Sequence, residues 1–132
     1  MSVFTVDLKN EPGKPAGLCE AMADGGINLV LAATAQGESG TVAFIADDEA
    51  GAETALESAG IEYTMRPALT IRLNNQPGTG ATAFRKLANA GVNTDLFLPV
   101  RVSGDVFFAV ICVDGTAAAY RALGDQVVDA DE

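Results

Sequence analysis

The first residues of the chain alternate between apolar and polar side chains. Phe4, Val6 and Leu8 are separated by polar residues, which is the period-two pattern of a strand with one buried face. A Pro-Gly pair interrupts this pattern, and Pro15 suits the first turn of a helix. The pattern predicts a strand followed closely by a helix.

The spacing of the next apolar residues is helical. Cys19, Met22, Ala23 and Gly26 lie at positions i, i+3, i+4 and i+7, so they share one face of a helix. We expect that face to be buried, with Cys19 in the core and not a reactive thiol. Cys112 lies far away and forms no CxxC pair, so it too is expected to be a small core residue.

The remaining elements of the first half follow in a regular order. Asp47, Asp48 and Glu49 suit the start of a helix, because acidic groups cap free amides and complement the helix dipole. Gly60 ends that helix. The sequence predicts a strand over 27–35, a turn over 37–40, a strand over 41–46 and, after the helix, a strand over 61–65.

Two motifs recur later in the chain with the same offset. Asn10-Glu11-Pro12-Gly13 returns as Asn75-Gln76-Pro77-Gly78, and Gly26-Ile27-Asn28 returns as Gly91-Val92-Asn93, each 65 positions later. A shared offset over both motifs and their apolar surroundings indicates an internal duplication. The sequence therefore predicts two repeats, 1–66 and 67–132.

The second repeat has the same pattern of elements as the first. Its predicted strands and helices cover 69–73, 80–90, 92–102, 106–113, 116–123 and 127–129. Strand-helix-strand-strand-helix-strand, written twice, is the split βαβ or ferredoxin-like arrangement. The predicted fold class is α/β (α+β), with two βαββαβ repeats and antiparallel sheets that carry their helices on one face.

The duplicated motifs resemble those of the ACT domain, a small regulatory module that binds amino acids. A strand ending in Asn-Glu-Pro-Gly, a helix, and Gly-Ile-Asn before the second strand carry this resemblance, and it covers nearly the whole chain. The resemblance implies that the repeats pair side by side, often as one eight-stranded sheet. It also implies regulation of an amino-acid-metabolism enzyme, although this chain carries no catalytic domain.

The resemblance further implies where a free amino acid binds. The ligand is expected between the first strand–helix loop of one repeat and the second strand of its neighbour. The residues at these positions are Asn10, Glu11, Pro12, Gly13, Ile27, Asn28, Leu29, Asn75, Gln76, Pro77, Gly78, Val92, Asn93 and Asp95.

The chemistry of these residues suits a zwitterion. Gly13 and Gly78 lack a Cβ, so backbone N–H groups can approach a ligand carboxylate, and the helix that follows adds its positive end. Asn28 and Asn93 offer both donors and acceptors, and Asp95 suits a ligand ammonium. The repeats differ in charge at several positions, so we expect unequal affinity, with one working site as an alternative.

Each motif also has a purely structural interpretation. Pro-Gly before a helix is an ordinary turn, and Gly-Ile-Asn is a helix C-cap leading into a strand. An exposed edge charge explains Asp95 nearly as well as a ligand contact. For a single repeat these interpretations are preferred, whereas the duplication and the resemblance favour the ligand site.

Composition narrows the remaining functions. The formal net charge is −10, with 18 acidic and 8 basic residues and no histidine, which disfavours nucleic acid and anionic membranes as partners. Histidine is the usual general base near neutral pH and a common metal ligand, and no catalytic or phosphate-binding motif is present. We expect a cytoplasmic protein that is not an enzyme and needs no cofactor or metal.

The third strands predict self-association. Residues 42–46 and 106–111 are apolar on both faces, whereas a strand with one solvated face is expected to alternate. Uncovered apolar surface marks an interface, so a homodimer is predicted, with burial between the two halves as the alternative. A second functional hypothesis is an ACT-like interaction subunit that has lost its ligand.

Overall fold

The computed structural model describes residues 1–128. The first of two compact units, called here the first repeat, comprises Ser2–Arg66, and the second repeat comprises Met1 with the chain from Pro67 onward. The elements of the first repeat are β1 (Ser2–Lys9), α1 (Lys14–Asp24), β2 (Leu29–Gln36), β3 (Ser39–Ala46), α2 (Glu49–Ser58) and β4 (Thr64–Pro67).

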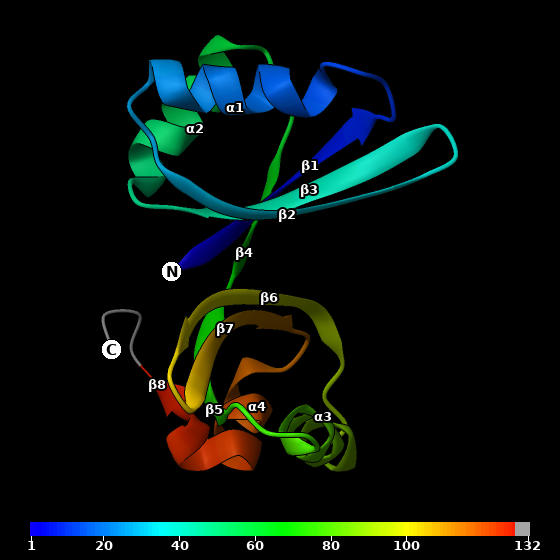
Figure 1. Ribbon diagram of the computed structural model, residues 1–132, viewed down its shortest axis with the longest axis vertical. Coiled ribbons are helices and arrows are strands. Elements are labelled where there is room, and N and C mark those ends of the chain that lie inside the picture. Colours follow the sequence, from blue (N-terminus) through cyan, green and yellow to red (C-terminus); the bar gives the residue numbers. More distant parts are fainter. Residues whose placement is uncertain (129–132) are drawn as a thin grey trace. The chain divides into compact units, whose positions relative to one another are not determined.

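The sheet of the first repeat has the strand order β2-β3-β1-β4. β3 is antiparallel to both β1 and β2, with Phe44 opposite Phe4 on one side and opposite Leu31 on the other. Both helices lie on one face of this sheet (Figure 1). β2 is an edge strand, and seven of its eight residues are exposed.

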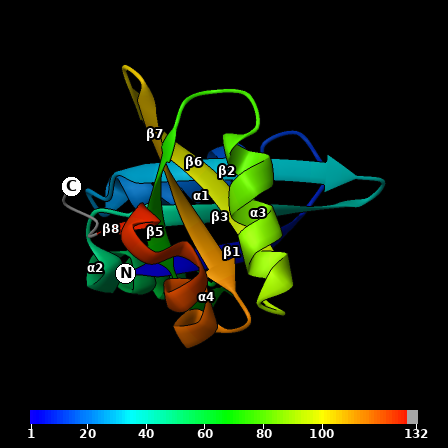
Figure 2. The same cartoon turned by 90° about the horizontal axis from the view of Figure 1, so that it is seen from below.

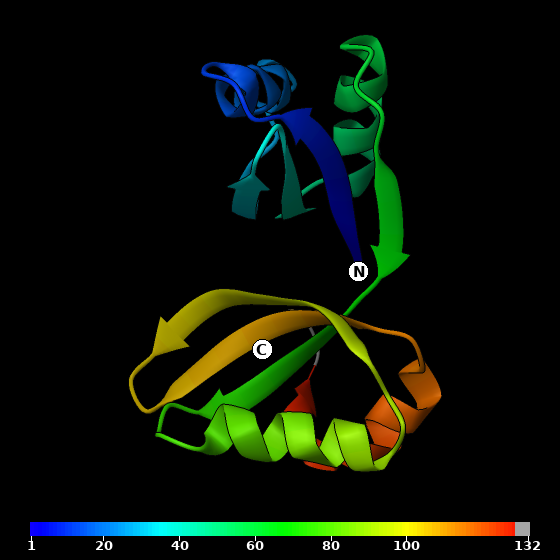
Figure 3. The ribbon, with the colours of Figure 1, turned by 90° about the vertical axis from the view of Figure 1, so that its right-hand side faces the viewer.

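The second repeat has the equivalent order, β6-β7-β5-β8. Its helices α3 and α4 lie together on one face of the sheet (Figures 2 and 3). Its elements are β5 (Leu69–Asn74), α3 (Thr79–Asn89), β6 (Thr94–Ser103), β7 (Val106–Val113), α4 (Thr116–Leu123), a 3₁₀ turn (Gly124–Gln126) and β8 (Val127–Val128).

These two four-stranded antiparallel sheets confirm the predicted ferredoxin-like fold class. The element order strand-helix-strand-strand-helix-strand occurs twice, as expected from the periodicity. A single eight-stranded sheet made from both stays a prediction. Residue 129, which was predicted to end the last strand, lies outside the described residues.

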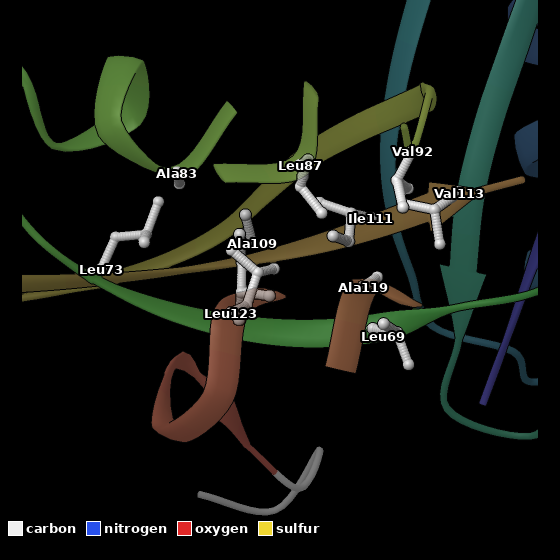
Figure 4. Close-up of a cluster of buried hydrophobic side chains, with 11 residues drawn as sticks. Leu69, Leu73, Ala83, Leu87, Val92, Ala109, Ile111, Val113, Ala119 and Leu123 are labelled. Carbon is white, nitrogen blue, oxygen red and sulfur yellow. The ribbon is translucent and has the colours of Figure 1, made fainter. Parts of the chain in front are cut away.

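Each repeat has its own hydrophobic core between the helices and the sheet. In the first, Phe4 and Phe44 stack with ring centroids 5.1 Å apart, and Leu18, Met22 and Leu56 pack around them. In the second, aliphatic side chains from α3, α4 and the sheet converge (Figure 4). This burial of apolar area is the main stabilising term for both units.

The predicted phase of the first helix is wrong. Cys19 is exposed, and the buried residues of α1 are Leu18 and Met22. α3 repeats the same shift, since it buries Ala83 and Leu87 and leaves Phe84 40% exposed. Leu18 has more apolar area to bury than Cys19, so a helix rotated by one residue is more stable.

Cys112 is buried, as predicted. Of the other apolar residues of β7 that point away from α3 and α4, Phe108 and Val110 are also buried, and Val106 is half-buried. The homodimer stays a prediction. No helix within residues 1–128 has the length and apolar character needed to cross a membrane.

Candidate functional site

The two strand–helix loops share an unusual backbone conformation. Gly13 and Gly78 stand at the N-caps of α1 and α3 with φ of 87° and 90°, a left-handed conformation that favours glycine. No side chain caps either helix start. The Lys14 and Thr79 N–H groups donate to the Glu11 and Gln76 carbonyls at 3.3 Å, and Pro15 has no N–H. The remaining first-turn N–H groups are directed toward this loop.

Each loop is tied to the hairpin of its own sheet. In the first repeat, the Asn10 backbone N–H donates to the Glu38 carbonyl, and Asn10 Nδ2 donates to the Gly37 carbonyl, both at 2.9 Å. In the second, the Asn75 backbone N–H donates to the Asp105 carbonyl at 2.6 Å. These bonds give the first asparagine of each motif a positioning role.

A pocket of about 150 Å³ opens beside the first of these loops. Its base contains Leu8 and Val42, which pack on the core side of the sheet. α1 contributes Pro15, and the loop contributes Asn10 and Glu11. The remaining lining comes from the end of β1 and from the β2–β3 hairpin: Lys9, Ala33, Thr34, Ala35, Gly40 and Thr41.

The lining of this pocket matches the two ends of a free amino acid. The start of α1, which no side chain caps, suits a ligand carboxylate, and the Glu11 carboxylate suits a ligand ammonium. Lys9 alternates with Leu8 along β1, so its side chain lies on the opposite face of the sheet from the pocket base. A volume of 150 Å³ corresponds to about five water molecules in the liquid. That space suits a small amino acid with a short side chain against the apolar base.

The Gly-Ile-Asn and Gly-Val-Asn motifs form helix C-caps. Gly26 has a φ of 72°, and the Ile27 backbone N–H donates to the Met22 carbonyl at 3.0 Å, which is the Schellman pattern. Val92 makes the same bond to Leu87 at 2.9 Å. Ile27 and Val92 are buried in the cores, so their side chains do not face a ligand.

The two asparagines of these motifs have internal partners. The Asn28 N–H donates to Asp47 Oδ1 at 3.0 Å, and the Asn93 N–H donates to Asp114 Oδ1 at 2.8 Å. Asn93 Nδ2 also donates to Asp95 Oδ1 at 2.8 Å. The side chains of Asn93 and Asp95, two residues apart, therefore contact each other.

Within one repeat, the two parts of the predicted site lie at opposite ends of the sheet. Lys9 is opposite Ser39 at one end of β3, and Leu29 is opposite Ala46 at the other. Seven residue steps of an antiparallel strand span about 24 Å. A site that uses both parts thus requires two repeats, as the resemblance implies.

The structure brings together some of the predicted residues and adds others. Asn10 and Glu11 line the pocket, while Pro12 and Gly13 form the exposed loop beside it. Gln76, Pro77 and Gly78 occupy the same positions in the second repeat. Sequence reasoning missed Lys9, Pro15 and the hairpin residues, although a run of small residues at 33, 35 and 40 was a visible signal.

Within residues 1–128, no group of three or more His, Cys, Asp or Glu side chains is arranged to hold a metal ion.

No family model and no curated protein matches the sequence. Solved structures do match it over nearly its whole length. Protein BT0572 from Bacteroides thetaiotaomicron has a TM-score of 0.84 at 21% identity, covering 96% of this chain and 90% of that one.

Two further matches are regulatory subunits of aspartate kinase. The subunit from Thermus thermophilus, in its ligand-free form, has a TM-score of 0.69 at 22% identity, and that from Thermus flavus has 0.64 at 20%. Each covers 95% of this chain and 90% of its own. The chain has the tandem ACT fold. The resemblance noted in the sequence is confirmed at the level of the fold.

Proposed function

We propose that this protein is an amino-acid-binding regulator without catalytic activity of its own. Fold alone does not establish function, so the proposal rests on the pocket beside the first strand–helix loop. There, the Glu11 carboxylate and the uncapped start of α1 lie beside a cavity with an apolar base.

The structural neighbours support the regulatory part of this proposal. They include regulatory subunits and a putative C-terminal regulatory domain of aspartate kinase. A ligand that binds one arrangement of the protein more tightly than another shifts affinity for a partner. We propose an enzyme of amino-acid metabolism as that partner and the cytoplasm as the location.

The second part of the predicted site belongs to this proposal as well. Asn28, Leu29, Asn93 and Asp95 lie at the sheet end opposite the loops. The ACT resemblance implies that the equivalent residues of a neighbouring repeat contact the ligand. Exposed Asn28 and Asp95 are suitable for that role, with the neighbouring repeat supplied by this chain or by a second copy in a homodimer.

A thermal-shift screen of the twenty amino acids tests the proposal. A ligand at 100 times its Kd adds about 2.7 kcal/mol of stability, so a true ligand raises Tm clearly. Glu11→Gln is expected to abolish that rise. Glu20→Gln is a matched control, because Glu20 is an exposed carboxylate of α1 that does not line the pocket.

The alternative function is an interaction subunit that keeps the fold without a ligand. The internal hydrogen bonds of Asn28 and Asn93 favour it, because they explain those residues as structural. Absence of a shift with all twenty amino acids would support this alternative against the sensor.

A further inference from the structure

The hairpins of the two repeats place different side chains at the same point of the fold. In the first repeat, Leu8 of β1 is opposite Gly40 of β3. In the second, Leu73 of β5 is opposite Phe107 of β7. Leu8 and Leu73 are equivalent in the duplication, so Phe107 occupies the position at which Gly40 borders the pocket.

Phe107 belongs to a row of aromatic side chains on the helix side of the second sheet. The ring centroids of Phe84 and Phe97 are 5.3 Å apart, and those of Phe97 and Phe107 are 6.4 Å apart. Both Phe97 and Phe107 pack against the core of the second repeat. Aromatic volume therefore fills the region that is hollow in the first repeat.

The charged groups differ at the same place. Glu11, whose carboxylate suits a ligand ammonium, corresponds to Gln76 in the second repeat. This replacement is neutral. Loss of the charge and gain of an aromatic ring are independent changes, and both act against binding of a free amino acid there.

The backbone geometry explains why the first repeat has Gly40 at this position and the second has Phe107. A Cβ on Gly40 would lie 2.8 Å from the Thr34 carbonyl oxygen and 3.0 Å from the Ala35 Cβ, because β2 pairs with β3 without interruption. β6 instead has a register irregularity between Pro99 and Arg101. Such a bulge bends the strand and makes room for Phe107.

We propose that each chain holds one amino acid, at the loop of the first repeat, and that Phe107 with Gln76 closes the equivalent position in the second. The inference rests on the proposed function and adds its stoichiometry and its ligand class. The apolar base of the pocket and the small residues around it, Ala33, Ala35 and Gly40, favour amino acids with short, uncharged side chains.

Isothermal titration with glycine, alanine, serine and threonine, against phenylalanine and tryptophan, tests both parts. We expect one ligand per chain from the first group and no binding from the second. Two equivalents per chain, or tight binding of tryptophan, would overturn the inference and leave the proposed function standing. No binding of any of the six, or of the other amino acids, removes the proposed function and this inference together.

A double variant tests the same two positions. Phe107→Ala with Gln76→Glu gives the second repeat the small residue and the carboxylate of the first. We expect the stoichiometry to rise from one to two, and Glu11→Gln in this background to return it to one. A folded double variant, checked by circular dichroism, that still binds one equivalent would show that these two residues do not close the second position.

Discussion

The two repeats share a fold but distribute their aromatic side chains differently. The first stacks Phe4 on Phe44 in the middle of its core, with an angle of 3° between the rings. At the equivalent paired positions, the second has Leu69 and Ile111. Its own aromatic rings lie on the β6 side and extend to the hairpin through Phe107.

This difference shows that the two copies of one fold distribute their core volume differently. Protein interiors are packed near crystal density, so a region of the core that is filled by aromatic rings leaves no space for a ligand. The first repeat concentrates its bulk in the centre and keeps small residues such as Ala33, Ala35 and Gly40 at the hairpin end. The pocket beside the loop of the first repeat is lined by no aromatic side chain.

The central aromatic pair of the first repeat is expected to give the largest effect. Phe44→Ala removes a fully buried ring that stacks on Phe4, and such truncations cost about 3–5 kcal/mol. Urea unfolding followed by circular dichroism measures this loss. Phe107→Ala, at a half-buried position, is expected to cost clearly less. Equal losses would contradict the different distribution of core volume.

The sequence predicts the fold well because both repeats carry strong periodic signals. It does not predict the phase of α1, because Leu18 and Cys19 are adjacent and both suit an apolar stripe. It predicts the loop of the candidate site but not the hairpin residues that line the pocket. The 65-residue offset aligns Gly40 with Asp105. Because β6 has 10 residues and β2 has 8, the strand pairing is shifted, and Phe107 lies at the position equivalent to Gly40.

The loop glycines are expected to have equal effects on stability and different effects on binding. A Cβ at Gly13 or Gly78 meets no atom within 4 Å, so Gly→Ala costs only the left-handed backbone energy, about 1–2 kcal/mol. Amino-acid binding is expected to weaken in Gly13→Ala alone. Gly17→Ala is the matched control, since this helical glycine also has open space and alanine favours a helix.

The second helix of each repeat begins differently. The Asp48 side chain caps α2 by accepting a hydrogen bond from the Gly51 N–H at 2.9 Å, whereas α4 begins at Gly115 without a side-chain cap. Asp48→Ala is expected to cost about 1 kcal/mol, and Gly115→Asp to gain a few tenths. A Cβ at Gly115 has ordinary contacts at 3.8 Å. Denaturant midpoints that move in the same direction would contradict this comparison.

The smallest expected effect concerns the tyrosine of each repeat. Tyr63 OH donates to Glu57 at 3.0 Å and to Glu53 at 3.2 Å, whereas Tyr120 is 51% exposed. Desolvation, followed by the hydrogen bonds to Glu57 and Glu53, raises the pKa of Tyr63 to about 12. In Tyr120→Phe, the ultraviolet absorbance of the one remaining tyrosine is therefore expected to titrate near pH 12.

The same shift determines how Tyr63 affects stability at alkaline pH. A raised pKa means that between pH 10 and 12 the folded chain keeps a proton that the unfolded chain releases, so stability falls as pH rises. The contribution of Tyr63 is complete below pH 10 and is lost as pH rises through about 12. Tyr63→Phe is expected to reduce this slope of unfolding free energy against pH. A slope that is unchanged in Tyr63→Phe but altered in Tyr120→Phe would assign the alkaline sensitivity to the second repeat.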